Sequence, residues 1–144
     1  MTLLIDARER RDVATADIVG AYLLTNMKDY VLLRIIGDTV NMMCQINPKY
    51  LSYVTQEGSK QVLYMRLKKA LYGCMQSAIL WYITFKNCLE HLGFKLNPYD
   101  PSVANEMVNG EQCTRCWYVD DSKISHVDTK IVDWVIENIE KQFG

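Results

Sequence analysis

Two chain-reversal signals lying close together constrain the fold of this sequence more than any other feature. Asn109-Gly110 lies between two strand-like runs, residues 103–108 and 112–119. Asn-Gly readily adopts the positive φ angles that a tight hairpin needs at both central positions. The second run ends at Asp120-Asp121, and residues 122–126 lead away again. The sequence therefore predicts consecutive antiparallel strands that reverse at these two dipeptides.

The rest of the chain mixes strand and helix signals, which indicates an α+β domain. Residues 1–8 resemble the end of a helix, and residues 12–18 alternate small or apolar with polar side chains, as in a half-buried strand. Residues 30–36 and 61–66 are further strand candidates, and Gly37-Asp38 precedes a short helical stretch that ends near Asn47-Pro48.

The clearest helix signal covers residues 77–92. Ser77 can cap its start and Gly93 can end it. One face of this helix is apolar, and we expect it to be part of the core. Its residues are Trp81, Phe85, Cys88, Leu89 and Leu92.

The paired acids at the second reversal have two readings. Aspartate is a common turn residue, and for an isolated Asp-Asp pair in a hairpin that reading is the simpler one. However, two adjacent like charges repel each other unless cations compensate them. A third acid, Asp17, ends the predicted strand 12–18. Carboxylates on neighbouring strand ends can hold the two divalent cations of a phosphoryl-transfer site.

Composition narrows the class of protein. The 144 residues are 49% hydrophobic, enough for one domain with its own core, and the formal net charge of −1 argues against tight independent binding to nucleic acid. Basic residues cluster only modestly, at 8–11 and 66–69. No apolar run approaches the roughly 20 residues that span a bilayer.

The cysteines and histidines suggest no second site. Five dispersed cysteines and the lack of an N-terminal signal sequence favour a reducing, intracellular setting. Cys113 and Cys116 have the spacing of a zinc half-site, but no second pair is present, so buried thiols are the simpler reading. His91 and His126 lack partners at the spacing of a hydrolase triad.

Five ordered blocks of the chain resemble the reverse transcriptase domain of copia-type (Ty1/copia) LTR retrotransposons. The resemblance extends from about Arg11 to Gly144, and it is more specific than the YVDD motif alone because several blocks contribute. The blocks are DIVGAY at 17–22, LYGCMQS at 71–77, WY at 81–82, NPYD at 97–100 and YVDD at 118–121.

The resemblance implies an RNA-directed DNA polymerase that transfers a nucleotidyl group from a dNTP to a primer 3′-hydroxyl, using two Mg²⁺ ions or Mn²⁺ as a substitute. It implies a palm, which is a mainly antiparallel sheet backed by helices, with part of the fingers. Residues 1–144 would form a single partial domain, without the N-terminal fingers, the thumb and the RNase H domain.

The resemblance also implies roles for individual residues. Asp17 and Asp120 match the metal-binding carboxylates, and Asp121 matches the third catalytic acid. The remaining matches concern the substrates. They are Ile18 (its carbonyl), Tyr22 (a steric gate against rNTPs), Tyr72, Gly73 and Gln76 for the nucleotide, and Tyr118 and Lys123 for the primer and template.

The implied partners are an RNA or DNA template with its primer, dNTPs, and the rest of a Pol polyprotein that includes integrase and RNase H. The implied location is intracellular, in a cytoplasmic retrotransposon particle or the nucleus, with no membrane. Ala78 and Ser122 depart from the family pattern, and we expect Ser122 to loosen the carboxylate hairpin. Two alternatives stay open: a catalytically inactive retroelement remnant, and a small binding module that uses the Asp120-Asp121 turn or the cysteine pair.

Overall fold

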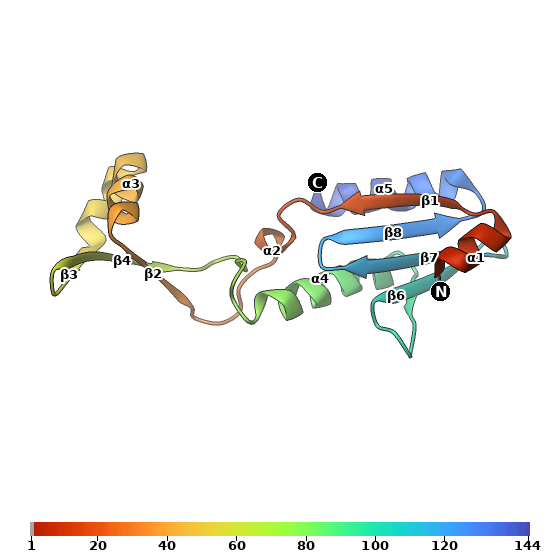
Figure 1. Cartoon of the computed structure of the whole chain (residues 1–144), viewed down its shortest axis with the longest axis horizontal. Helices are drawn as coiled ribbons and strands as arrows, with labels where there is room; N and C mark the ends of the chain where they lie inside the picture. Colours follow the sequence, from red (N-terminus) through yellow and green to blue (C-terminus); the bar gives the residue numbers. More distant parts are fainter. Residues whose placement is uncertain (1) are drawn as a thin grey trace.

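The computed structural model describes residues 2–144 and shows an α+β fold with two antiparallel sheets (Figure 1). The larger sheet has five strands in the order β1-β8-β7-β6-β5, and the smaller has three in the order β2-β4-β3. The strands are β1 Asp12–Asp17, β2 Leu32–Ile36, β3 Val54–Glu57, β4 Lys60–Arg66, β5 Lys95–Leu96, β6 Val103–Val108, β7 Glu111–Tyr118 and β8 Asp121–His126. The helices are α1 Thr2–Glu9, α2 Ala21–Leu24, α3 Asp38–Ile46, the 3-10 helix η1 Pro48–Tyr53, α4 Ser77–His91 and α5 Thr129–Phe143.

Both predicted hairpins are present in the larger sheet. Asn109 and Gly110 have φ angles of 52° and 85° and connect β6 to β7. Val119 and Asp120 connect β7 to β8, where Tyr118 is paired with Asp121. The predicted strands at 12–18, 30–36 and 61–66 and the helical stretch after Gly37 are also confirmed, with ends shifted by one or two residues. Of the predicted helix at residues 1–8, Met1 lies outside the described residues.

Helices α4 and α5 cover one face of the larger sheet. The apolar face predicted for α4 is confirmed, because Trp81, Phe85 and Leu89 are buried and Cys88 and Leu92 lie at the edge of the core. Apolar residues of α5 and of the strands complete this core. They include Val132, Val135 and Ile139 from α5 and Ala104, Cys113, Trp117 and Ile124 from the sheet.

The predicted cap of α4 is wrong. Ser77 is the first helical residue and its hydroxyl does not cap the helix. Instead, Ser77 Oγ donates to the carbonyl of Leu71 at 2.7 Å and accepts from the Leu71 N–H at 3.0 Å. These two bonds attach the segment before α4 to the first turn of the helix.

The other face of the larger sheet is open except where α1 lies against it. Side chains alternate along a strand, so Asp17, Asp121 and Lys123 share this open face with Thr114 and Cys116. Together with α1, the open face forms a broad depression of about 1030 Å³. Asp17 and Asp121 lie at one end of it.

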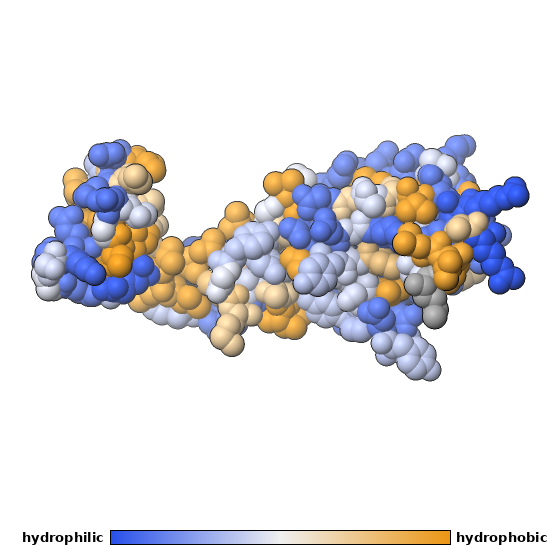
Figure 2. All heavy atoms as spheres, in the orientation of Figure 1, coloured by the Kyte–Doolittle hydropathy of each residue, from blue (hydrophilic) through white to orange (hydrophobic). Residues whose placement is uncertain are grey.

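The three-stranded sheet and α3 form a separate body, here called the small lobe (residues 32–66), at some distance from the larger sheet (Figure 1). Two linking segments, residues 25–31 and 67–76, connect the small lobe to the larger sheet. They run side by side and are joined to each other by backbone hydrogen bonds such as Met27 N–H to Lys68 O at 3.0 Å. Figure 2 shows apolar side chains along these segments and on the small lobe. Exposed ones include Leu32, Leu33, Ile36, Met42 and Ile46.

Arg115 of β7 is fully buried, and its side chain lies between the larger sheet and α4. Its guanidinium lies 4.8 Å from the centre of the Phe85 ring, and its Nη2 donates to Ser122 Oγ at 2.9 Å. Its Nε and Nη1 have no hydrogen-bond partner within residues 2–144. Desolvation lowers the pKa of Arg115 to about 10. Ser122 also donates to the carbonyl of Ala16 at 3.2 Å, so it ties β8 to β1 instead of loosening the hairpin as expected.

We expect Arg115→Met to raise the free energy of unfolding by about 1–3 kcal/mol at pH 7, because the substitution removes a buried charge that has no counter-ion among residues 2–144. The folded-state pKa of Arg115 lies below its ordinary value, so the cost of the charge is fully present below pH 10 and is relieved as the pH rises above 10. Urea denaturation between pH 6 and 9 measures the difference. The control Arg115→Lys keeps the charge and is expected to gain nothing; a Met variant less stable than the wild type would contradict the prediction.

Candidate active site

The structure brings the three predicted carboxylate residues to one end of the larger sheet. Asp17 and Asp121 are directly paired across β1 and β8, and both lie on the open face. Side chains at such paired positions have Cβ atoms about 4.5–5.5 Å apart. Asp120 belongs to the adjoining turn, and its carbonyl accepts a hydrogen bond from Ile18 N–H at 3.2 Å. Residues more than 100 positions apart in the sequence are thereby held together by backbone.

The turn that carries Asp120 is strained. Val119 has a φ of 55°, and the structure shows no positive φ at Asp120. A positive φ at the first central residue alone is typical of a type II′ turn, where glycine is the usual residue. A β-branched side chain in this region is a genuine outlier and indicates that surrounding contacts enforce the conformation.

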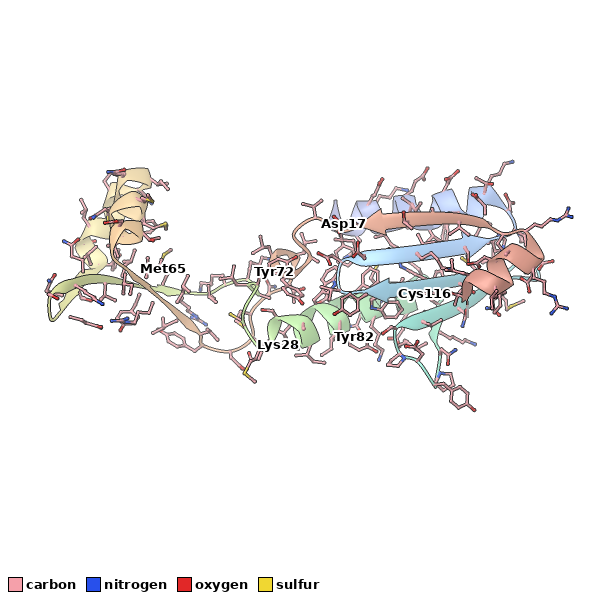
Figure 3. All side chains as sticks on the ribbon, viewed as in Figure 1. Asp17, Lys28, Met65, Tyr72, Tyr82 and Cys116 are labelled. Atoms are coloured by element: carbon pink, nitrogen blue, oxygen red, sulfur yellow. The ribbon has the colours of Figure 1, made fainter. Side chains whose placement is uncertain are left out.

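Two tyrosines whose rings pack against each other at a tilt lie beside the carboxylates. The rings of Tyr22 and Tyr72 have centroids 4.4 Å apart, and the Tyr72 hydroxyl donates to Asp120 Oδ2 at 3.4 Å. Figure 3 shows Tyr72 on the linking segment next to the end of β1 that carries Asp17. Local desolvation and then the Asp120 carboxylate raise the pKa of Tyr72, with smaller contributions from Tyr22 and Asp17. Tyr72 is therefore a neutral hydrogen-bond donor to Asp120 at physiological pH.

The raised pKa of Tyr72 leads to a titration prediction. The difference in tyrosinate absorbance between wild type and Tyr72→Phe isolates one hydroxyl, and we expect its midpoint above pH 10. In an Asp120→Asn background the midpoint is expected to fall toward 10, because the neighbouring negative charge is gone. The contribution of the Tyr72 hydroxyl proton to the free energy of unfolding is fully present below pH 10 and is lost as the pH rises above 10. Equal midpoints in the two backgrounds would contradict the assignment.

The donor set at this edge fits a hard divalent cation. All three side chains are carboxylates, which Mg²⁺ prefers, and a cation would relieve the repulsion between the directly paired Asp17 and Asp121. However, within residues 2–144 no three or more His, Cys, Asp or Glu side chains converge into a group that could hold a metal ion. Metal binding at Asp17, Asp120 and Asp121 therefore stays a prediction, and it requires their side chains to turn toward one another.

The two residues predicted to contact the primer lie on the open face. Tyr118 is 80% exposed and is paired with Asp121. Lys123 follows Asp121 on the same face, but its ammonium forms an ion pair with the buried Asp6 of α1. Although burial alone would raise the pKa of Asp6, the hydrogen bond from Lys123 lowers it below its usual value. The ammonium of Lys123 is thus already paired with a carboxylate of this chain.

The other predicted nucleotide-binding residues are arranged less tightly around the carboxylates. The carbonyl of Ile18 accepts from Ala21 N–H at 3.2 Å. Gly73 has a φ of 91°, and beyond its two chain neighbours no atom lies within 4 Å of the place that a Cβ would occupy, so its backbone is openly accessible. Gln76 is exposed, and its amide donates to Asp29 instead of facing the carboxylates.

The structure does not support the cysteine pair as a zinc half-site. Cys113 is buried on the face covered by helices, whereas Cys116 lies on the open face (Figure 3). Burial raises the pKa of Cys113 to about 11, which keeps it a protonated thiol. A cysteine binds zinc as its thiolate.

Two contributors to the site were not predicted from the sequence. Trp81 was predicted only as a core residue, but its indole Nε1 donates to the carbonyl of Val119 at 2.6 Å. Asp6 was not predicted to reach the sheet at all. For Trp81, its polar N–H in a buried position was the available signal, because such a group usually finds a partner. For Asp6 the sequence holds no comparable signal.

No family model, curated protein or solved structure matches this chain. Within residues 2–144, none of the helices combines the length and the apolar character needed to cross a membrane.

Proposed function

We propose that this chain is part of a copia-type reverse transcriptase, an RNA-directed DNA polymerase, and that the larger sheet with α4 and α5 is its palm. The observation that carries the proposal is the direct pairing of Asp17 with Asp121, with Asp120 in the adjoining turn. Three carboxylates on neighbouring strand ends are what a two-metal nucleotidyl-transfer site requires. The small lobe corresponds to part of the fingers.

The carboxylates would hold two Mg²⁺ ions. When bound, these ions would lower the pKa of the primer 3′-hydroxyl and compensate the negative charge of the triphosphate. The chain itself supplies rigidity, since Asp17 and Asp121 lie on paired strands and the Asp120 backbone is bonded to Ile18. The Tyr72 hydroxyl, as a neutral donor, orients one oxygen of Asp120.

Tyr22 and Tyr72, which pack against each other, are suited to select the sugar of the incoming nucleotide. Tyr22 is half-buried and packs against the core of the larger sheet and against a second, small apolar cluster, so its ring has little freedom to move aside. The buried residues of this second cluster are Met27, Ala70 and Leu80. Tyr72 covers it and remains half-exposed beside Asp120. A fixed ring at this position would leave no room for a 2′-hydroxyl, and this supports the assignment of Tyr22 as the steric gate.

The distribution of charge supports a nucleic-acid partner. Residues 25–76, which comprise the small lobe and its linking segments, carry seven Lys or Arg and three Asp or Glu, a net charge of +4. The remaining residues carry nine basic and fourteen acidic side chains, a net charge of −5. The nearly neutral total therefore hides a basic part next to an acidic site. A basic surface of this kind can bind the phosphates of template or primer.

In this proposal the template, primer and dNTPs are the substrates, and the rest of a Pol polyprotein completes the enzyme. Primer extension on an RNA template with Mg²⁺ or Mn²⁺ tests the proposal. The assay compares this chain, a longer polypeptide that contains it, and the longer polypeptide with Asp120→Asn. Extension that is lost in the variant supports the polymerase. No extension by any of the three would favour an inactive remnant.

A further inference from the structure

The turn between β7 and β8 has an energetically unfavourable backbone that something must hold. Val119 has a φ of 55° as the first of two turn residues, a position where glycine is the usual residue. If the peptide between Val119 and Asp120 rotated, the turn would change from type II′ to type I′, and Asp120 would also need a positive φ. The direction of the Asp120 side chain therefore depends on the orientation of this one peptide group.

Two hydrogen bonds from different elements hold the turn. The indole Nε1 of Trp81 donates to the Val119 carbonyl at 2.6 Å, and Ile18 N–H donates to the Asp120 carbonyl at 3.2 Å. The first of these carbonyls belongs to the peptide group that joins Val119 to Asp120. The indole of Trp81 thus acts directly on the orientation that decides where Asp120 points.

Trp81 is itself firmly held. It is 1% exposed, its ring stacks on Phe85 with centroids 5.4 Å apart, and Phe143 of α5 packs edge-on against it at 5.2 Å. The donor therefore has a fixed position behind the turn. A rigid donor from the core is what a turn needs when its own sequence does not favour the conformation.

We propose that Trp81 is a positioning residue for the carboxylate site: by holding the Val119 carbonyl, it fixes the type II′ turn and with it the backbone position of Asp120 beside the paired Asp17 and Asp121. This inference rests on the proposed function, because it gives the turn a purpose in binding divalent cations. Trp81 does not touch a cation or a substrate. It acts only through the backbone of the turn.

Trp81→Phe tests the proposal because it removes the N–H and keeps an aromatic ring in the core. The control is Tyr82→Phe, in which the next residue of α4 also loses a donor to a backbone carbonyl, that of Pro101 at 3.4 Å. Mn²⁺ binding is measured by electron paramagnetic resonance, and amide hydrogen exchange is measured at residues 119–122. Both variants are first shown to keep the folded circular dichroism of the wild type.

We expect Trp81→Phe to weaken Mn²⁺ binding by about 10-fold or more, as loss of a supporting hydrogen bond does at metal sites. Exchange at residues 119–122 should become faster, and Tyr82→Phe should change neither property. Unchanged exchange in Trp81→Phe, or equal effects in both variants, would overturn the proposal. If the wild type binds no Mn²⁺, the proposed function fails, while the exchange comparison still decides whether Trp81 holds the turn.

Discussion

Phe85→Ala is expected to lower the free energy of unfolding by about 3–5 kcal/mol, the largest effect on stability that we predict. Phe85 is 1% exposed and lies at the centre of the aromatic core, with ring centroids 5.4 Å from Trp81, 5.6 Å from Trp117 and 6.0 Å from Phe143. The substitution leaves a cavity between the sheet and both helices. It also removes the ring over which the guanidinium of Arg115 lies.

Urea denaturation measures this loss, and Ile83→Ala on the same helix is the control. Ile83 is 39% exposed, so its truncation should cost less than about 1 kcal/mol. The comparison separates loss of core packing from the change in helix propensity, since both variants place alanine in α4. Equal costs for the two variants would show that the core described here is not the one that stabilises the chain.

Asp120→Asn is expected to slow primer extension by a polypeptide that contains this chain by at least about 10²-fold, the scale of removing one group that stabilises developing charge. The substitution keeps the size of the side chain and its bond from Tyr72, but it removes the negative charge that a divalent cation needs. The rate of extension at saturating dNTP on an RNA template is the measurement.

Asp128→Asn is the matched control for this prediction. Asp128 caps the start of α5 by accepting from Lys130 N–H at 3.0 Å, and asparagine caps a helix about as well as aspartate. Extension should therefore be unchanged. A loss of extension in Asp128→Asn equal to that in Asp120→Asn would indicate a general effect of charge, and the catalytic assignment would be withdrawn.

The elements that could be predicted from the sequence are those with strong local signals. The hairpin at Asn109-Gly110 was predicted correctly because its backbone conformation is a property of those two residues. The apolar face of α4 was predicted because helical periodicity is visible within one segment. The position of Asp17 at the end of β1 followed in the same way.

The elements that were missed have weak local signals or depend on distant partners. The two-residue strand β5 exists only because Lys95 and Leu96 pair with β6. Helix α5 is the exception, because Asp128 is a cap and apolar residues recur at helical spacing from Ile131 to Ile139, so the available signal was overlooked. The role of Ser77 was wrong because its hydroxyl bonds to Leu71 across a loop instead of to its own helix.

The sequence predicted that Asp17, Asp120 and Asp121 lie at neighbouring strand ends, but it did not predict how they are held there. The bond from Tyr72 to Asp120 and the ion pair of Lys123 with Asp6 join residues 48 and 117 positions apart, and no local pattern encodes either contact. The positive φ of Val119 is likewise unexpected from its residue type. Such local conflicts are most often found at functional sites, which is consistent with the function proposed for this turn.

Mn²⁺ binding measured by electron paramagnetic resonance is the direct test of whether Asp17, Asp120 and Asp121 together bind divalent cations. The measurement compares the wild type with Asp17→Asn and Asp12→Asn, which alter opposite ends of the same strand β1. We predict that the wild type and Asp12→Asn bind Mn²⁺ with the same affinity and that Asp17→Asn loses the binding. No binding by the wild type, or equal binding by all three proteins, would show that these carboxylates do not form a cation site.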